Sequence, residues 1–240
     1  MKHPLLKDII ISPPFGKWLN FSWATSVGGS YTILHRPGII KQAIKTIRKT
    51  KLGWVNRTEL RNPGLLSHPA KLDRDKIISF VALRPEDWDI FLYSIPSYHM
   101  VEINLGCPNS ENALIVPSTF EDFVNKYKLV TVKLPGVLSQ ALEYFEIAYS
   151  GGARIFHICN TIPVKQGGLS GQRVKELSLR IISIIRSEGY NSVTIIAGGG
   201  IYTPIDVIDY KNAGADHFSL STIWFTPWRV SAVVKEINFQ

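Results

Sequence analysis

The chain of 240 residues has few cysteines, only Cys107 and Cys159. Two thiols cannot supply a disulfide framework, a four-cysteine zinc site or an iron–sulfur cluster. Long apolar runs are missing as well: no uninterrupted stretch reaches about 18 residues, which excludes a membrane-spanning helix of the usual kind. The N-terminus also lacks the apolar segment of a secretory signal. We therefore expect a protein of the reducing cytoplasm.

Acidic residues are scarce relative to basic ones, 19 against 27, and the net charge is +8. Such an excess favours anionic partners, including phosphates, carboxylates, nucleic acid and anionic membranes. The basic residues are concentrated between positions 39 and 61. Lysines at four-residue steps form one stripe of an expected helix there, and isoleucines form the opposite stripe: Lys41, Lys45, Lys49 and Ile40, Ile44, Ile47. We interpret the lysines as the solvated face of an ordinary barrel helix, with RNA or membrane contact as alternatives.

Short β-branched runs alternate with helical patterns from residue 77 onward. Strands are expected at 77–81, 101–105, 129–134, 154–159, 193–197 and 217–220, with helices between and after them. This alternation is typical of parallel βαβ units. A (β/α)8 barrel needs eight strands, so two more must lie in the first 75 residues. An open, doubly wound sheet is the alternative fold.

Polar residues and glycines follow these expected strands at their C-terminal ends. They are Asn104 and Cys107, Lys133, Asn160 and Thr161, Gly198 to Gly200, and Ser221 and Thr222. In a barrel the C-terminal ends of the strands converge on one mouth, where active sites lie. We therefore predict a (β/α)8 TIM barrel, a single domain over residues 1–240, with one site at that mouth.

Two of these segments predict a phosphate-bearing cofactor. Gly198 to Gly200 join a buried strand to a helix capped by Thr203. Backbone amides in such a turn can hold a phosphate, helped by the positive end of the helix. Ser221 and Thr222 would add donors after the next strand. Lys133 ends a strand among apolar neighbours, where it needs an anionic partner such as the N1–C2=O edge of a reduced flavin.

The densest polar segment surrounds Cys107. Asn104 and Asn109 offer paired donors and acceptors, which suit a ring that carries amide and carbonyl groups. A cysteine at a barrel mouth can act as a base or a nucleophile when its pKa is tuned. Cys159 and His157 fall inside an expected strand, and we interpret both as buried structural residues.

A family resemblance rests on these segments and their order. Residues 101–109, VEINLGCPN, resemble the E-x-N-x-S-C-P-N motif of dihydroorotate dehydrogenases. Other segments follow in that family's order: NRTELRNPG at 56–64, VKLP at 132–135, NT at 160–161, GGLSG at 167–171, AGGGI at 197–201 and ST at 221–222. The resemblance extends over roughly residues 30–225, and the ordered succession is more specific than any single motif.

The resemblance implies FMN-dependent oxidation of dihydroorotate to orotate, a step of pyrimidine biosynthesis. Cys107 would take the C5 proton while a hydride leaves C6 for FMN, and a cysteine at this position resembles the class 1 enzymes. The resemblance implies these pyrimidine contacts: Asn56, Leu60, Asn104, Asn109, Asn160 and Thr161. It implies these FMN contacts: Lys133, Gly167, Gly168, Gly199, Gly200, Ser221 and Thr222.

Three features depart from the family pattern. Gly29 stands where the family usually has a lysine, and Glu59 stands in place of a glycine. Residues 24–26 resemble the end of the family's first strand, and only residues 27–30 separate them from the presumed second strand. Parallel neighbours need a crossover of about a dozen residues, so we expect an abbreviated N-terminal βα unit. Arg57 and Arg61, oriented by Glu59, are candidates to replace the missing cation, or else point to solvent.

Two alternative functions remain open at this stage. A tRNA-dihydrouridine synthase has an N-x-G-C-P motif that Gly106 matches, and a basic chain suits RNA. Asn109, the 160–161 pair and residues 167–171 match the dehydrogenase instead, so a nucleic-acid partner is not expected. A flavin-binding barrel without turnover is the other alternative. The electron acceptor (fumarate, a quinone, or NAD through a partner subunit) and a homodimeric state are left undecided.

Overall fold

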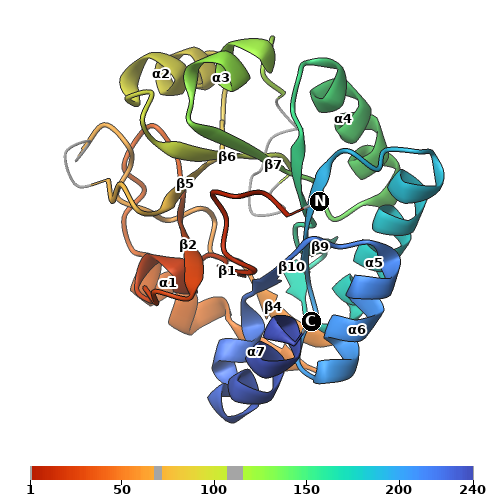
Figure 1. Ribbon diagram of the computed structural model, residues 1–240. Coiled ribbons are helices and arrows are strands. Elements are labelled where there is room, and N and C mark those ends of the chain that lie inside the picture. Colours follow the sequence, from red (N-terminus) through yellow and green to blue (C-terminus); the bar gives the residue numbers. More distant parts are fainter. Residues whose placement is uncertain (1, 68–71, 107–115, 240) are drawn as a thin grey trace.

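The computed structural model describes residues 2–67, 72–106 and 116–239. Eight parallel strands close into a barrel in the order β1-β12-β11-β8-β7-β6-β5-β2 (Figure 1). They are β1 (Ile9–Ile11), β2 (Ala24–Tyr31), β5 (Ile77–Phe80), β6 (Met100–Asn104), β7 (Leu129–Lys133), β8 (Ile155–Ile158), β11 (Thr194–Gly198) and β12 (His217–Leu220). The predicted barrel is confirmed, and the open sheet is excluded.

Helices surround this barrel and cover its apolar outer face (Figure 1). They are α2 (Asp87–Ser94), α3 (Glu121–Lys126), α4 (Leu138–Ser150), α5 (Gln172–Ser187), α6 (Pro204–Ala213) and α7 (Val230–Asn238). The predicted limits of α6 are confirmed: Thr203 forms a capping box with Asp206, Pro204 opens the first turn, and Gly214 closes the helix at φ 98°. Buried aliphatic and aromatic side chains fill the space between strands and helices.

The N-terminal part of the barrel corrects one expectation. The first strand is β1 (Ile9–Ile11), which pairs in parallel with both β12 and β2. Residues 24–26 begin the eight-residue strand β2 and do not end the first strand. The crossover between β1 and β2 contains the short 3-10 turn η1 (Phe15–Lys17) in place of an α-helix. The first βα unit is thus abbreviated, as predicted, but the barrel is closed.

An insertion between β2 and β5 builds a second, smaller sheet above the barrel mouth. It contributes β3 (Arg48–Thr50) and β4 (Gly53–Asn56), and β4 pairs antiparallel with β10 (Gly167–Ser170). The sheet order is β3-β4-β10-β9, where β9 spans Ile162–Val164. This pairing carries the loop after residue 56 to the segment that follows β8. Two distant predicted motifs therefore meet at one place.

The same insertion contains α1 (Ile39–Thr46), whose packing differs from the expectation. None of its residues is buried, and Ile40 and Ile44 are 73% and 74% exposed. Lys49 lies in β3, beyond the helix. The lysines face solvent as expected, but the interpretation as an ordinary barrel helix is wrong, because α1 lies on the insertion and not against the barrel strands. Within the described ranges, no helix is long and apolar enough to cross a membrane.

Candidate active site

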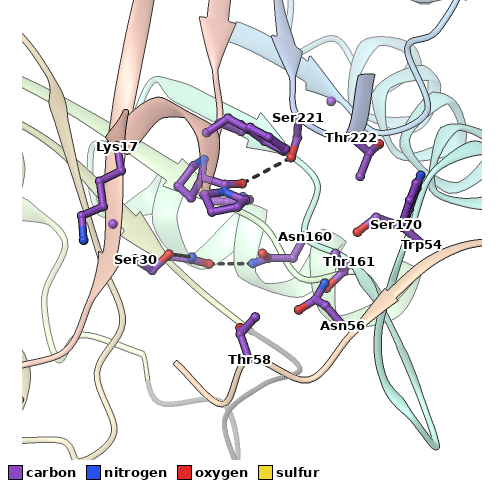
Figure 2. A pocket seen from close by; sticks show the side chains of 18 of the residues that line it. Lys17, Ser30, Trp54, Asn56, Thr58, Asn160, Thr161, Ser170, Ser221 and Thr222 are labelled. Atoms are coloured by element: carbon purple, nitrogen blue, oxygen red, sulfur yellow. Dashed lines mark hydrogen bonds between the residues drawn. The ribbon is translucent and has the colours of Figure 1, made fainter. Parts of the chain in front are cut away.

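A cavity of about 240 Å³ opens where the barrel strands end (Figure 2). Several of its lining residues lie at the end of a barrel strand or within two residues of it, including Ser12, Lys133, Asn160 and Ser221. The small sheet and the loop after β4 form its other walls. Figure 2 shows Ser221 and Thr222 at one end and Thr58 at the other, with Asn160 between them. The predicted convergence of strand ends on one site is confirmed.

Side-chain amides form a connected network in this cavity. Nδ2 of Asn160 donates to Oδ1 of Asn104 at 2.7 Å and to the carbonyl of Leu105 at 2.7 Å. Nδ2 of Asn104 in turn donates to Oγ of Ser30 at 2.7 Å. Both asparagines are buried, yet each amide group keeps donor or acceptor capacity for a ligand. Asn56 and Thr161 line the same cavity, so this part of it suits a planar polar ring.

A buried, hydrogen-bonded pair lies beneath this network inside the barrel. Nδ1 of His157 is 2.7 Å from Oε2 of Glu102, and both side chains are at most 2% exposed. Burial alone would raise the pKa of Glu102, but the charge and hydrogen bond of His157, with the nearby charge of Lys133, outweigh burial and lower it well below its usual range. The interpretation of His157 as a satisfied interior residue is confirmed. Lys133 ends β7 and lines the cavity above the pair.

The glycine turn offers backbone donors to the cavity. Gly199 lines it together with Ser221 and Thr222. The N–H groups of Gly199 and Gly200 make no hydrogen bond to any part of the chain that the structure describes. Oγ1 of Thr222 accepts from the Tyr202 hydroxyl at 2.5 Å and keeps its own proton for another acceptor. Unpaired donors that converge on a cavity fit an anion such as a phosphate.

The N-terminus of α6 contributes less than the sequence suggested. Oδ2 of Asp206 already accepts the backbone N–H of Tyr202 at 2.9 Å and that of Thr203 at 2.8 Å. Pro204, at the first position of the helix, has no N–H to offer. The expectation that the helix end assists an anion is therefore corrected, because its capping box satisfies most of the donors. The donors that remain belong to the turn.

Three of the glycines predicted to bind cofactor do not line the cavity: Gly167, Gly168 and Gly200. Gly168 pairs with Asn56 across β10 and β4. A Cβ on Gly167 would lie 2.2 Å from the Asn56 carbonyl oxygen, and the φ of Gly167 is +127°. Position 167 therefore requires glycine, because the strand that contains Asn56 lies too close for any side chain. A cofactor contact from these three residues stays a prediction.

The loop after β4 places one arginine at the cavity. Nη2 of Arg61 lies 3.0 Å from Oε2 of Glu59, and Nε of Arg57 lies 3.6 Å from Oε1. The Arg61 hydrogen bond is the main reason that the pKa of Glu59 is lowered. Arg61 and the buried Leu60 line the cavity, whereas Arg57 does not and its side chain is 56% exposed. The predicted ion pair is confirmed, and it orients Arg61.

Gly29 lines the cavity at the position where a lysine was expected. Its φ is +129°, and a Cβ there would lie 2.4 Å from the Ser79 carbonyl oxygen. The backbone of this chain therefore excludes any side chain at position 29. The backbone conformation of β2 at this position therefore has no room for a lysine.

Of the two cysteines, only Cys159 is described. It follows β8 directly, is buried, and lies 3.3 Å through Sγ from Oγ of Ser178. Burial is the main cause that raises its pKa to about 11, which keeps the thiol protonated and unreactive. The structural interpretation of Cys159 is supported. Cys107 and Asn109 lie outside the described residues, so their predicted roles stay predictions.

Several cavity residues were not singled out from the sequence. Ser12 follows β1, a strand too short to recognise by pattern, and Ser30 lies in β2. The rings of Trp54 and Phe225 stack with centroids 4.4 Å apart and form an aromatic wall. These two residues are far apart in the sequence, and no local signal connects them.

The model of the dihydroorotate dehydrogenase family matches residues 15–239. The chain belongs to this family. Among curated relatives, the catalytic subunits of dihydroorotate dehydrogenase B (NAD(+)) from Bacillus mycoides and Bacillus cereus are each 27% identical over 225 residues, which covers 80% of this chain and 72% of the relative. The family resemblance and the oxidoreductase class predicted from the sequence are confirmed. The match favours the dehydrogenase over the tRNA-dihydrouridine synthase.

Solved structures of family members share the fold. The ligand-free DHODH of Eimeria tenella superposes with a TM-score of 0.71 at 17% identity, and covers 98% of this chain and 87% of its own. The complex of the same enzyme with ferulenol gives a TM-score of 0.71 at 16% identity, over 96% and 80% of the two chains. At 16–17% identity, these superpositions show a shared barrel fold and no more.

Proposed function

We propose that this chain is an FMN-dependent dihydroorotate dehydrogenase that oxidises dihydroorotate to orotate. The observation that carries the proposal is the composition of one cavity. Its amide network offers complementary groups for a pyrimidine ring, and its glycine turn offers unpaired N–H donors for a phosphate. The amide network suits a planar polar substrate, and the glycine turn suits the phosphate of one flavin.

The residues of the turn fit the phosphate of FMN. The N–H of Gly199 and the Thr222 hydroxyl supply donors, with Ser221 beside them. Lys133 lies on the floor, where its ammonium group would face the flavin ring. When bound, FMN supplies the acceptor for the hydride that leaves C6 of dihydroorotate.

The chain itself binds and orients the substrate and moves a proton. Asn56, Asn104 and Asn160 would hold the amide and carbonyl groups of the pyrimidine. Cys107 would remove the C5 proton as a thiolate base. In the sequence this cysteine follows Asn104 by three residues.

A separate protein would then accept the electrons. The curated relatives are named catalytic subunits of an NAD(+) enzyme. We extend this organisation to the present chain, with a cytoplasmic location and a partner subunit that oxidises the flavin. Substrate and cofactor phosphate would take the two ends of the cavity, so the acceptor would act from outside.

The proposed function predicts a yellow protein that dihydroorotate bleaches. Purified protein reconstituted with FMN is mixed with dihydroorotate without oxygen, and the visible flavin absorbance is recorded. We expect the oxidised flavin band to disappear and orotate to form in equal amount. A protein that stays colourless with FMN, or that keeps its flavin oxidised, contradicts the proposal.

Arg61 is expected to bind the carboxylate of orotate in place of the missing lysine. Nη2 of Arg61 donates to Glu59 and Nη1 to the carbonyl of Pro37, and the buried Nε has no partner among the described residues, so this charged N–H is the donor left for the carboxylate. Arg61→Ala should weaken orotate binding by roughly tenfold to a hundredfold, measured by the shift of the flavin spectrum.

Arg57→Ala is the matched control for Arg61, because Arg57 contacts the same Glu59 carboxylate but does not line the cavity. It should leave orotate affinity within about twofold. Equal affinities in wild type and Arg61→Ala would show that this arginine does not bind the carboxylate.

A further inference from the structure

The glycine turn is held from behind by a buried tyrosine. The hydroxyl of Tyr210, on α6, donates to the carbonyl oxygen of Gly199 at 2.7 Å and to that of Gly198 at 3.0 Å. Ser178, on α5, donates to the Gly198 carbonyl at 2.8 Å. Tyr210 and Ser178 are both fully buried. Neither residue lines the cavity, so neither can contact a ligand there.

These bonds determine where the amides of the turn point. In a planar trans peptide, the carbonyl of one residue and the N–H of the next point in opposite directions. The carbonyls of Gly198 and Gly199 point toward the helices, and the N–H groups of Gly199 and Gly200 therefore point the other way. Those are the two N–H groups that have no partner among the described residues.

Gly198 ends β11 and pairs with Ser219, but Gly199 and Gly200 lie beyond the strand and cannot keep this orientation by themselves. Glycine adopts positive and negative φ at similar cost, so each peptide plane of the turn can rotate. The turn needs glycine nonetheless: Gly199 has a φ of +98°, and a Cβ there would lie 2.4 Å from Cγ1 of Val174. An interaction outside the turn must select one orientation.

We propose that Tyr210 is a positioning residue for the cofactor phosphate: it holds the Gly198 and Gly199 carbonyls and so fixes the orientation of the next two N–H groups, of which that of Gly199 belongs to the cavity lining. This inference rests on the proposed binding of FMN and adds a residue that never touches it. Burial raises the pKa of Tyr210, which keeps the hydroxyl protonated and able to donate. Ser178 supports one of the two carbonyls.

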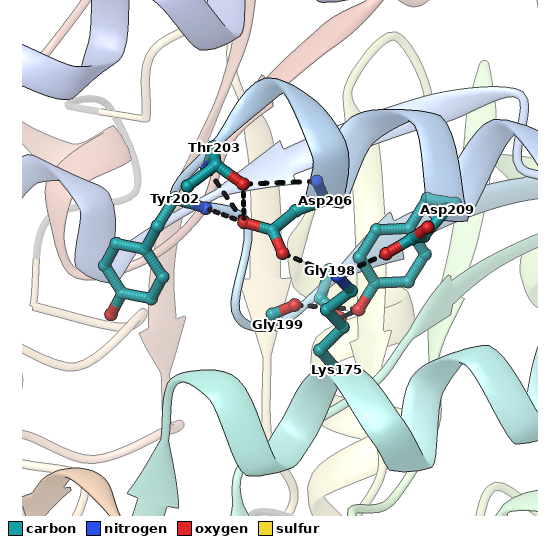
Figure 3. Close-up of polar contacts among 8 residues, drawn as sticks. Lys175, Gly198, Gly199, Tyr202, Thr203, Asp206 and Asp209 are labelled. Atoms are coloured by element: carbon teal, nitrogen blue, oxygen red, sulfur yellow. Dashed lines mark hydrogen bonds and ion pairs between the residues drawn. The ribbon is translucent and has the colours of Figure 1, made fainter.

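The ion pair beside the turn keeps α6 in place for this role. Nζ of Lys175 lies 2.5 Å from Oδ1 of Asp206 and 2.6 Å from Oδ2 of Asp209 (Figure 3). Asp206 also caps the N–H groups of Tyr202 and Thr203. Because Asp206 is in ion contact with Lys175, its charge is partly neutralised on the side of the turn. An anion at the turn is then repelled less.

The test compares FMN with riboflavin, which lacks the phosphate. Dissociation constants of both flavins are measured by fluorescence quenching for wild type, Tyr210→Phe and Ser178→Ala. We expect Tyr210→Phe to weaken FMN binding by about tenfold to a hundredfold and riboflavin binding by less than about twofold. Ser178→Ala should weaken FMN binding by a smaller factor, because one carbonyl keeps its bond to Tyr210.

Tyr127→Phe is the matched control. The Tyr127 hydroxyl also contacts two successive carbonyls, those of Phe91 at 3.2 Å and Leu92 at 3.1 Å, and the residue is buried far from the turn in sequence. It should alter thermal stability but neither dissociation constant. Ser178→Ala serves in place of Tyr210→Phe if that variant does not fold.

Each outcome decides between the inference and the proposed function. If wild type binds FMN no better than riboflavin, the phosphate site fails and the inference falls with it. If wild type prefers FMN but Tyr210→Phe binds it equally well, only the inference is overturned. Equal losses for both flavins in Tyr210→Phe also overturn it, because they indicate a general packing effect.

Discussion

Replacing Cys107 with alanine is expected to slow dihydroorotate oxidation by about 10²–10⁴-fold while FMN remains bound. The proposed role of the thiol is to remove the C5 proton, and alanine has no group that can do so. FMN binding should persist because its proposed contacts, Gly199, Ser221 and Thr222, lie after other strands. The measurement is the rate of flavin reduction by dihydroorotate in single-turnover experiments without oxygen.

Cys159→Ala provides the comparison within the same chain. Burial raises the pKa of Cys159 to about 11, so its thiol stays neutral at the pH of the assay. Its loss should change the reduction rate by less than about threefold. Similar losses in the two variants would mean that the base has been misidentified.

Glu102→Ala is expected to cause the largest loss of stability, about 3–5 kcal/mol in the free energy of unfolding. The carboxylate is fully buried and pairs with His157 at 2.7 Å. Alanine would leave the imidazole N–H without a partner inside the barrel, and a cavity beside it. Chemical denaturation at about pH 7 measures the loss. A change of less than about 1 kcal/mol would contradict a stabilising role for the pair.

Glu102→Gln is the conservative control and also tests the charge. Its amide oxygen can still accept from His157, so it should cost less than alanine. The pKa of Glu102 in the folded protein lies below its usual value of 4.5. Its stabilisation is therefore fully present above that pH and is lost as the pH falls below it toward the folded value. As the pH falls from about 4.5 toward 2, wild type should lose more stability than Glu102→Gln.

Local patterns predicted the C-terminal two thirds of the fold well. Most of the barrel strands from β5 to β11 contain β-branched runs, which are recognisable without knowing the neighbouring strands. The limits of α6 follow from Thr203, Pro204 and Gly214, which act through their own backbone. The ion pair of Glu59 with Arg61 was also predictable, because the two residues lie two positions apart.

The first strand and the exposure of α1 depended on the tertiary structure. β1 has three residues, too few for a periodic signal, and it forms a strand because β12 and β2 provide partners on both sides. The stripe of Ile40 and Ile44 has the spacing of a buried face, but spacing does not tell whether another element covers it. In this chain none of the described elements buries it.

The sequence by itself determined the barrel class, the family and several of the residues that line the cavity, because these follow from periodicity and from motifs read in order. Only the tertiary structure decided which groups are available to a ligand. It shows that Asp206 occupies donors at the start of α6, that Tyr210 orients the amides of the turn, and that Arg61, not Arg57, reaches the cavity. Hydrogen bonds between distant elements determine these outcomes, and no local sequence pattern encodes them.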